Sequence, residues 1–207
     1  MKIRNGFVSN SSSSSFVIAL DTNPMEMTME ELRTLLFGEQ ELFAKYDYAF
    51  TTKDLAQTIL KDIQECHERE EKETSWGYNA NCFEGKLSKE GLIETICSGD
   101  FDGSPEYIWR DRESDKIEDE AKRQGITEPY KDPKWNKLIH EARDKEYAEH
   151  DRLTKIAATE LADPFWEANK DKYLYALEYS DNEGQKGCVL EHGNVFRNIP
   201  HIQISHH

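Results

Sequence analysis

The sequence predicts an α+β fold in which strands from the two ends of the chain form a small antiparallel sheet. Three observations support this prediction. A short apolar run, Phe16–Leu20, stands near the N-terminus. Residues 21–171 place apolar side chains at helical spacing, and residues 172–207 return to the two-residue alternation of strands. Terminal strands with helices between them are typical of a sheet covered by a large helical insertion.

We expect the 207 residues to form a single domain with three consecutive parts. A serine-rich loop and the first strand occupy residues 1–20, the helical region occupies 21–171, and the C-terminal strands occupy 172–207. No internal repeat divides the chain. The first strand is expected to pair with a strand over Tyr173–Tyr179, which would bring the two ends of the chain together.

A run of five serines, Ser11–Ser15, precedes the first strand. Serine runs are usually flexible linkers, but apolar residues stand on both sides of this one, including Phe7, Val8 and Phe16. A flexible tail seldom carries such side chains, because it cannot bury them. We therefore predict a fixed loop that enters a core strand.

Capping residues predict where the first helices begin. Thr28 and Glu31 form a capping box for a short helix that ends near Gly38. Thr51 or Thr52 caps a second helix, which runs to about Lys72. A loop over residues 75–86 follows, and then a helix capped by Ser88 and stopped by Gly99.

The rest of the helical region is highly charged. A helix is predicted over Ser114–Gln124, and its paired acids and bases are typical of a solvated face. Asp132-Pro133 begins a long helix or a broken pair of helices, and Asp163-Pro164 begins one more turn.

The last residues read as strands joined by turns. After the strand over Tyr173–Tyr179, a hairpin turn is predicted at Asp181–Gly184. A return strand over Lys186–Leu190 follows, and His201–Ser205 alternates once more.

Composition limits the classes of function. The net charge of −15 argues against direct binding of nucleic acid, because phosphates repel an acidic surface. No apolar run approaches the roughly 18 residues of a membrane span, and no signal peptide is apparent, so we expect a cytoplasmic protein without a membrane partner. The four cysteines form no Cys-x-x-Cys pair, and no cofactor is predicted.

The segment Lys2–Phe16, with the sequence KIRNGFVSNSSSSSF, resembles an N-terminal signature of a family of tailed-phage and prophage proteins. The C-terminal segment Leu190–His207 is similar to C-termini of the same kind of protein. The resemblance implies a phage or prophage origin and a bacterial host cytoplasm. It implies no activity for any residue.

The serine loop is the first candidate site. Hydroxyls, amides and a guanidinium could form a polar nest for an anion or a phosphorylated ligand. Two other interpretations stay open: the serines bond the backbone of a tight bend, or a modifying enzyme recognises the segment. The candidate ligand-binding residues are Arg4, Asn5, Ser9, Asn10, Ser11, Ser12 and Ser13.

The C-terminal histidines are the second candidate site. His192 or His201, with Glu191, could act in acid–base catalysis. A metal set is also possible, since imidazole and thiolate bind transition metals. The candidate metal ligands are Cys188, His192, His201 and His206. The third interpretation is that these are ordinary surface or hydrogen-bonded histidines.

Three functions remain in contention. We favour a phage-encoded accessory protein that binds a host or phage protein in host takeover or in countering host defence. This rests on the acidic charge, the absence of a catalytic motif and the phage-like N-terminus. The acidic charge would suit a basic partner. The first alternative is a small enzyme with its site between the Ser/Asn loop and the histidines. The second is a minor virion component.

Overall fold

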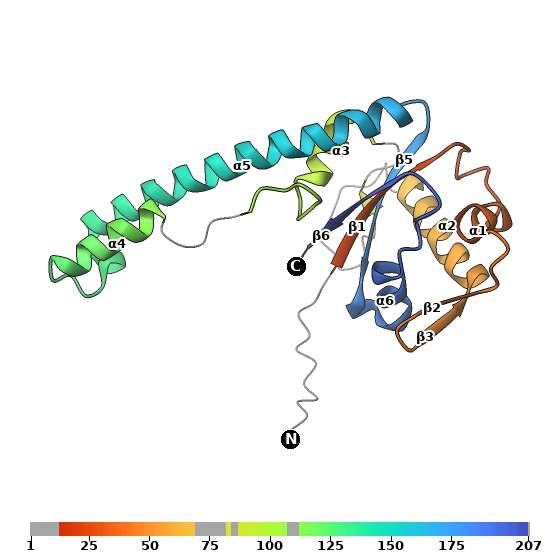
Figure 1. Ribbon diagram of the computed structural model, residues 1–207, viewed down its shortest axis with the longest axis horizontal. Coiled ribbons are helices and arrows are strands. Elements are labelled where there is room, and N and C mark those ends of the chain that lie inside the picture. The colour runs from red at the N-terminus through yellow and green to blue at the C-terminus, as the bar shows by residue number, and fades with distance from the viewer. Residues whose placement is uncertain (1–12, 69–81, 84–86, 107–111, 207) are drawn as a thin grey trace, which may run out of the picture. The chain divides into compact units, whose positions relative to one another are not determined.

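The computed structural model describes residues 13–68, 82–83, 87–106 and 112–206. It confirms the α+β class, with an antiparallel sheet built from strands near both ends of the chain and helices between them (Figure 1). The chain divides into two compact units. One consists of residues 1–102 and 162–207, and the other of residues 103–161. The main sheet belongs to the first unit.

The main sheet has the strand order β4-β5-β1-β6, and all its pairs are antiparallel. Its strands are β1 (Ser13–Leu20), β4 (Cys82–Phe83), β5 (Tyr173–Ser180) and β6 (His201–Ser205). β1 lies between β5 and β6, so the prediction that the two ends share one sheet is confirmed. Of the predicted loop over residues 75–86, only β4 falls within the described residues.

The serine run is partly strand rather than loop. Ser13, Ser14 and Ser15 begin β1, where Ser13 lies opposite Ser180, while Ser11 and Ser12 lie outside the described residues. Ser14 and Ser15 are buried. Serine has little intrinsic preference for a strand, so pairing with two neighbouring strands decides the conformation here.

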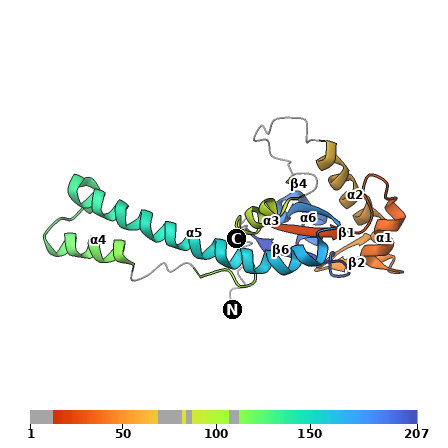
Figure 2. The same cartoon turned by 90° about the horizontal axis from the view of Figure 1, so that it is seen from above.

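Helices cover both faces of the sheet (Figures 1 and 2). Phe16, Ile18 and Leu20 lie in one apolar cluster with buried side chains of α1 (Met29–Phe37), α2 (Thr52–Glu68) and α6 (Gly184–His192). On the opposite face Val17 and Ala19 are also buried. A strand covered on both faces is apolar at consecutive positions rather than alternate ones.

The helix α3 (Lys89–Ile96) reaches the edge strand β6. A Cβ atom added at Gly99, just after α3, would lie 2.4 Å from the carbonyl oxygen of Ser205. Asp100 forms an isolated bridge with Ser205. The turn after α3 therefore packs directly on the backbone of β6.

The predicted helix starts are confirmed by their hydrogen bonds. Thr28 accepts from the amide of Glu31, whose carboxylate accepts from the amide of Thr28. Thr51 Oγ1 accepts from the amide of Asp54 in the first turn of α2. Ser88 caps α3. The predicted end of the second helix near Lys72 lies outside the described residues.

A second, two-stranded sheet was not predicted. It is the hairpin of β2 (Leu42–Lys45) and β3 (Tyr48–Thr51). Its turn carries no glycine, and Tyr46 adopts a φ of 55° there. Because the usual Asn-Gly or Asp-Gly signal is absent and the strands are four residues long, the sequence pattern did not reveal this hairpin.

The long helix α5 (Pro133–Asn169) is continuous, with Pro164 inside it. Asp132 caps it through the amides of Lys134 and Trp135, as predicted. The prediction that Asp163-Pro164 begins a separate helical turn is wrong. Proline removes one backbone hydrogen bond, but here that loss does not end the helix.

The prediction of a hairpin turn at Asp181–Gly184 and a return strand over Lys186–Leu190 is also wrong. Asp181–Glu183 forms a 3-10 turn, and α6 follows it. A short apolar run fits either a strand or a helix. Packing selects the helix, because it buries the side chains of Val189 and Leu190 in the same apolar cluster as Phe16.

The unit of residues 103–161 pairs α4 (Glu113–Arg123) with the first part of α5. The backbone amide and the hydroxyl of Ser114 both donate to the carboxylate of Glu146. Arg143 donates to the hydroxyl of Tyr130, which bonds Glu118. Among the described helices, none is both long and apolar enough to cross a membrane.

Candidate metal centre

Most of the predicted serine-loop site lies outside the described residues. This applies to Arg4, Asn5, Ser9, Asn10, Ser11 and Ser12. The remaining member, Ser13, pairs through β1 with Ser180 at the end of β5.

The structure does bring the serine run and a C-terminal histidine together. Ser15 Oγ and His206 Nε2 are 2.8 Å apart, and the residues are separated by 191 positions in the chain. Ser15 is fully buried, with an exposed fraction of 0%. Its hydroxyl is therefore closed to a substrate, and the hydrogen bond ties β1 to the end of β6.

The C-terminal histidines do not converge on one site. His201 Nδ1 lies 3.0 Å from the carbonyl oxygen of Ile199, and His206 bonds Ser15. His192 instead lies beside Glu191, with its Nε2 3.4 Å from Glu191 Oε2. Of the predicted metal candidates, the structure thus separates His192 from His201 and His206.

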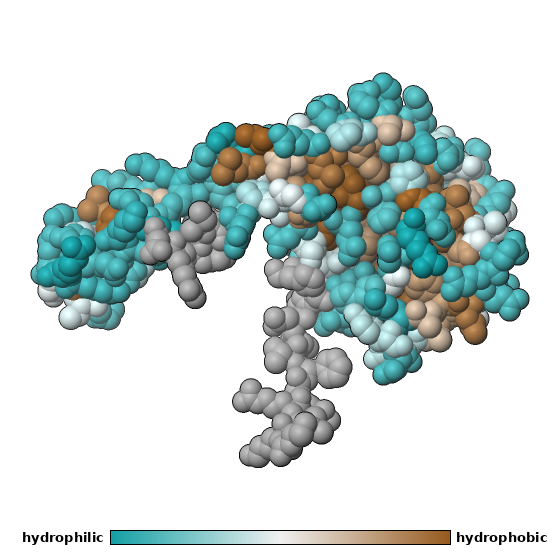
Figure 3. Space-filling model, viewed as in Figure 1, coloured by the Kyte–Doolittle hydropathy of each residue, from teal (hydrophilic) through white to brown (hydrophobic). Residues whose placement is uncertain are grey.

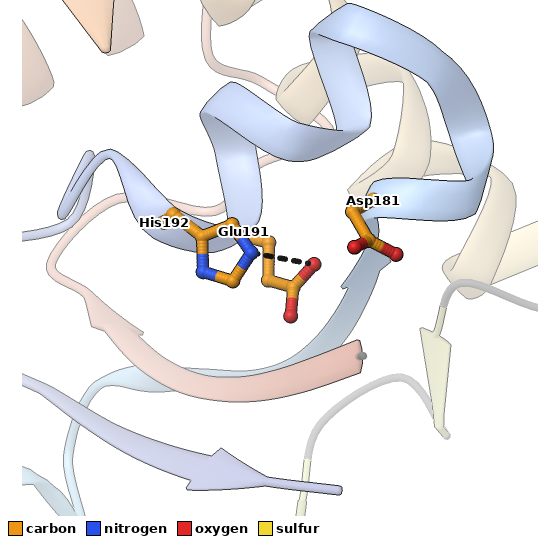
Figure 4. A group of neighbouring side chains, drawn as sticks. All are labelled: Asp181, Glu191 and His192. Atoms are coloured by element: carbon orange, nitrogen blue, oxygen red, sulfur yellow. Dashed lines mark ion pairs between the residues drawn. The ribbon is translucent and has the colours of Figure 1, made fainter. Parts of the chain in front are cut away.

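Asp181, Glu191 and His192 form a compact group of potential metal ligands (Figure 4). One ligand atom from each residue lies within 4.8 Å of the other two. Asp181 follows β5 directly, and Glu191 and His192 are the last two residues of α6. Among the residues that the structure describes, this is the one such group with three members.

Local backbone features return α6 to the end of β5. Ser180 Oγ accepts from the amide of Asn182 and begins the turn, and Gly184 has a φ of 82°. A Cβ added at Gly187 would lie 2.2 Å from the carbonyl oxygen of Ser180. Because only glycine permits this approach, α6 packs closely enough on β5 to bring Glu191 back toward Asp181.

Glu191 is unusual because its side chain is completely buried without a hydrogen-bond donor. Its side-chain exposure is 0%, and neither carboxylate oxygen accepts a hydrogen bond. Asp181 Oδ1 is also buried without a donor. Burial of a carboxylate is costly unless a cation or a donor compensates it. The neighbouring imidazole at 3.4 Å is the only partner that the described residues supply to Glu191.

Cys188 lies one helical turn before His192, and the charges of the ligand group act on the pKa of its thiol. Burial raises the pKa of its thiol, and the nearby carboxylates of Asp181 and Glu191 raise it further, while Lys45 lowers it. A raised pKa keeps the thiol protonated and weakens it as a nucleophile. Cys188 is not a member of the compact ligand group.

The donor set suits a divalent transition metal. Two carboxylates and one imidazole carry two negative charges, which a divalent cation neutralises. The imidazole suits zinc, iron or nickel, and the two carboxylates also suit manganese, whereas calcium prefers oxygen ligands alone. Three protein ligands leave at least one coordination position for water or another ligand, which is typical of catalytic rather than structural sites.

Sequence reasoning found Glu191 and His192 but missed Asp181. The predicted hairpin placed Asp181 in a turn and placed Lys186–Leu190 in a strand, which points successive side chains to opposite faces. Had residues 184–192 been predicted as a helix, Asp181 and Glu191 would have been expected to lie close together.

The comparisons with known proteins identify no relative. No protein-family model, curated protein or solved structure matches this chain.

Proposed function

We propose that this protein binds a divalent transition-metal ion through Asp181, Glu191 and His192. The observation that supports this most strongly is the fully buried carboxylate of Glu191, which accepts no hydrogen bond. A native structure seldom leaves a buried carboxylate without a hydrogen-bond donor, and a bound ion is one of the few explanations. A cation between Asp181 and Glu191 would compensate both carboxylates at once.

The proposed ion would keep an exchangeable position. His192 is partly exposed, at 27% of its side chain, so the ligand group lies near the surface although Glu191 is buried. A metal with an open position can bind a substrate or activate water. We therefore propose the ends of β5 and α6, rather than the serine loop, as the position of a small-enzyme site.

Isothermal titration of the chelator-treated protein with Mn²⁺, Co²⁺ and Zn²⁺ tests the proposal. We expect one site per chain. Glu191→Gln should weaken the metal affinity by about tenfold or more, because loss of a group that only supports a metal ligand already costs about that much. Glu183→Gln is the matched control, because it removes one carboxylate charge from the turn that carries Asp181, outside the ligand group. Unchanged affinity in Glu191→Gln would refute the proposal.

A second candidate function is binding of a host or phage protein in the bacterial cytoplasm. The observation in its favour is a set of exposed apolar side chains on α5 in the unit of residues 103–161, where apolar groups interrupt a hydrophilic surface (Figure 3). These residues are Leu138, Leu153 and Ile156. Leu153 and Ile156 are three residues apart and therefore neighbours on the helix surface. Contiguous exposed apolar surface often contacts a partner protein.

Affinity capture from phage-infected bacterial lysate tests this candidate. The chain should retain a reproducible partner, and the double variant Leu153→Asp/Ile156→Asp should release it. The matched control is Lys155→Glu, which changes charge between the two apolar positions without removing apolar surface. Mass spectrometry of purified particles would separate this function from that of a minor virion component.

A further inference from the structure

The β2–β3 hairpin has two chemically different faces. Alternate residues of its strands point the same way, so Phe43, Lys45, Tyr48 and Phe50 share one face. These four side chains are buried or half-buried. Leu42 points to the other face and is exposed. The first face is therefore the one that packs on the rest of the unit.

This face lies against the C-terminal end of α6, where the proposed metal ligands stand. A Cβ added at Gly193 would lie 2.8 Å from the ring of Phe43. At the hairpin turn, the ring of Tyr46 meets the ring of His192 edge-on, with centroids 6.0 Å apart. Tyr46 is itself 67% exposed, so it reaches both the ligand group and the solvent.

Lys45 carries a positive charge beside the ring of Tyr46. Its Nζ lies 5.1 Å from the centroid of the Tyr46 ring. Its charge also acts on Cys188, one turn before His192. Lys45 forms no ion pair with any of the described residues, whereas other cations of this acidic chain, such as Lys89 and Lys122, pair with carboxylates.

Two further cations of the hairpin region use aromatic rings in the same way. Lys186 lies 5.9 Å from the ring centroid of Phe50, and Arg197 lies 5.8 Å from that of Phe43. Cation–π contacts hold a positive charge without neutralising it. Lys186 also contacts Thr58 of α2. It lies in the first turn of α6, six residues before His192.

We propose that a small phosphate-bearing anion completes the metal centre, with Lys45 and Tyr46 forming the wall opposite the protein ligands. This inference rests on the proposed metal site. The divalent ion and the two carboxylates together carry no net charge, so a further cation would strengthen the binding of an anion. Lysine binds phosphate as a point charge, and metal ions accept phosphate oxygens in open positions. The exposed Tyr46 ring offers an apolar surface to a group esterified to the phosphate.

Titration calorimetry of the Mn²⁺-loaded protein with inorganic phosphate tests this inference. A parallel titration with adenosine monophosphate separates a free anion from a phosphate ester. We expect binding in both cases, and Lys45→Gln should weaken it roughly tenfold, as loss of one charge-assisted hydrogen bond does. Because the proposed site sets the Tyr46 ring against the ester group, Tyr46→Ala should weaken binding of the monophosphate more than binding of inorganic phosphate.

Lys186→Gln is the matched control, since it removes another cation that rests on a hairpin ring. We expect it to leave phosphate affinity within about twofold, and both lysine variants to keep their Mn²⁺ affinity. Absence of phosphate binding to the Mn²⁺-loaded protein would overturn this inference alone. Equal losses in Lys45→Gln and Lys186→Gln would also overturn it, because they would indicate a general charge effect. Failure of Mn²⁺ to bind would instead refute the proposed function.

Discussion

The hydroxyl of Tyr179 donates a hydrogen bond to Asp62, with Tyr179 Oη and Asp62 Oδ2 3.2 Å apart across 117 positions of the chain. Tyr179 lies in β5 and is fully buried, and Asp62 lies in α2. Burial raises the pKa of Asp62 to about 6, and the charges of Glu65 and Glu183 add to the rise, while the Tyr179 hydrogen bond and Lys61 oppose it. The carboxylate is thus less stable in the folded protein than in the unfolded chain.

We predict that Asp62 makes the protein less stable as the pH rises. The folded pKa, about 6, is above the ordinary value of 3.8, so the folded state binds the proton more tightly. The contribution of protonated Asp62 to the free energy of unfolding is fully present below about pH 4, and it is lost as the pH rises through 6. Because Asp62 is partly solvated, we expect a loss on the order of 1–2 kcal/mol, less than the full shift implies.

Urea denaturation between pH 4.5 and 7.5 measures this effect. Asp62→Asn should remove the fall in the free energy of unfolding that Asp62 causes over this range. Asp119→Asn, at an exposed position on α4, is the control and should keep the pH profile of the parent protein. A profile that is identical in the parent and Asp62→Asn would contradict the prediction.

Glu191→Gln is predicted to have opposite effects with and without metal. In chelator, removal of a buried charge without a donor should stabilise the protein by about 1–3 kcal/mol. With metal at 100 times its dissociation constant, the parent should gain about 2.7 kcal/mol and the variant much less. Thermal unfolding in EDTA and in Mn²⁺ measures both effects. Destabilisation of the chelated variant would mean that Glu191 has a stabilising partner other than a metal ion.

Gly187→Ala is predicted to destabilise the protein and to weaken the metal site together. The added Cβ would lie 2.2 Å from the backbone oxygen of Ser180, so α6 must shift away from β5. We expect a loss of about 1–3 kcal/mol, as for other overpacked positions. Gly91→Ala in α3 is the matched control, because its Cβ would meet only ordinary contacts at 3.4 Å. It should be neutral or slightly stabilising. Denaturation and Mn²⁺ titration of both variants check this prediction.

Ser15→Ala is predicted to destabilise the pairing of β1 with the C-terminal end of the chain. It removes the 2.8 Å hydrogen bond to His206 and should cost about 1 kcal/mol. Ser14→Ala is the control, since Ser14 Oγ lies at the longer distance of 3.5 Å from Gln203 Nε2. Hydrogen exchange at the amide of His206, which bonds the carbonyl of Ser13, should quicken in Ser15→Ala. Equal protection in the two variants would show that backbone pairing alone holds this end.

The candidate site was only partly predictable, for a reason that its residues make clear. Glu191 and His192 are neighbours in sequence, so both were identified as candidates. Asp181 stands ten positions earlier and joins them only because α6 is a helix and Gly187 lets it fold back on β5. Tyr46 and Lys45 come from a hairpin whose turn has no glycine signal. The contact of the Tyr46 ring with His192 depends on packing that no local pattern records.

Periodicity and capping by themselves determined the order of the main elements. The apolar run in β1, the alternation in β5 and the caps at Thr28, Ser88 and Asp132 are local features, and local backbone preferences act within a few residues. Tertiary structure alone decided that Ser13–Ser15 extend a strand, that α5 continues through Pro164 and that the segment after β5 is helical. At these places the local preferences are weak or conflicting. Burial and hydrogen bonds with distant segments therefore select the conformation.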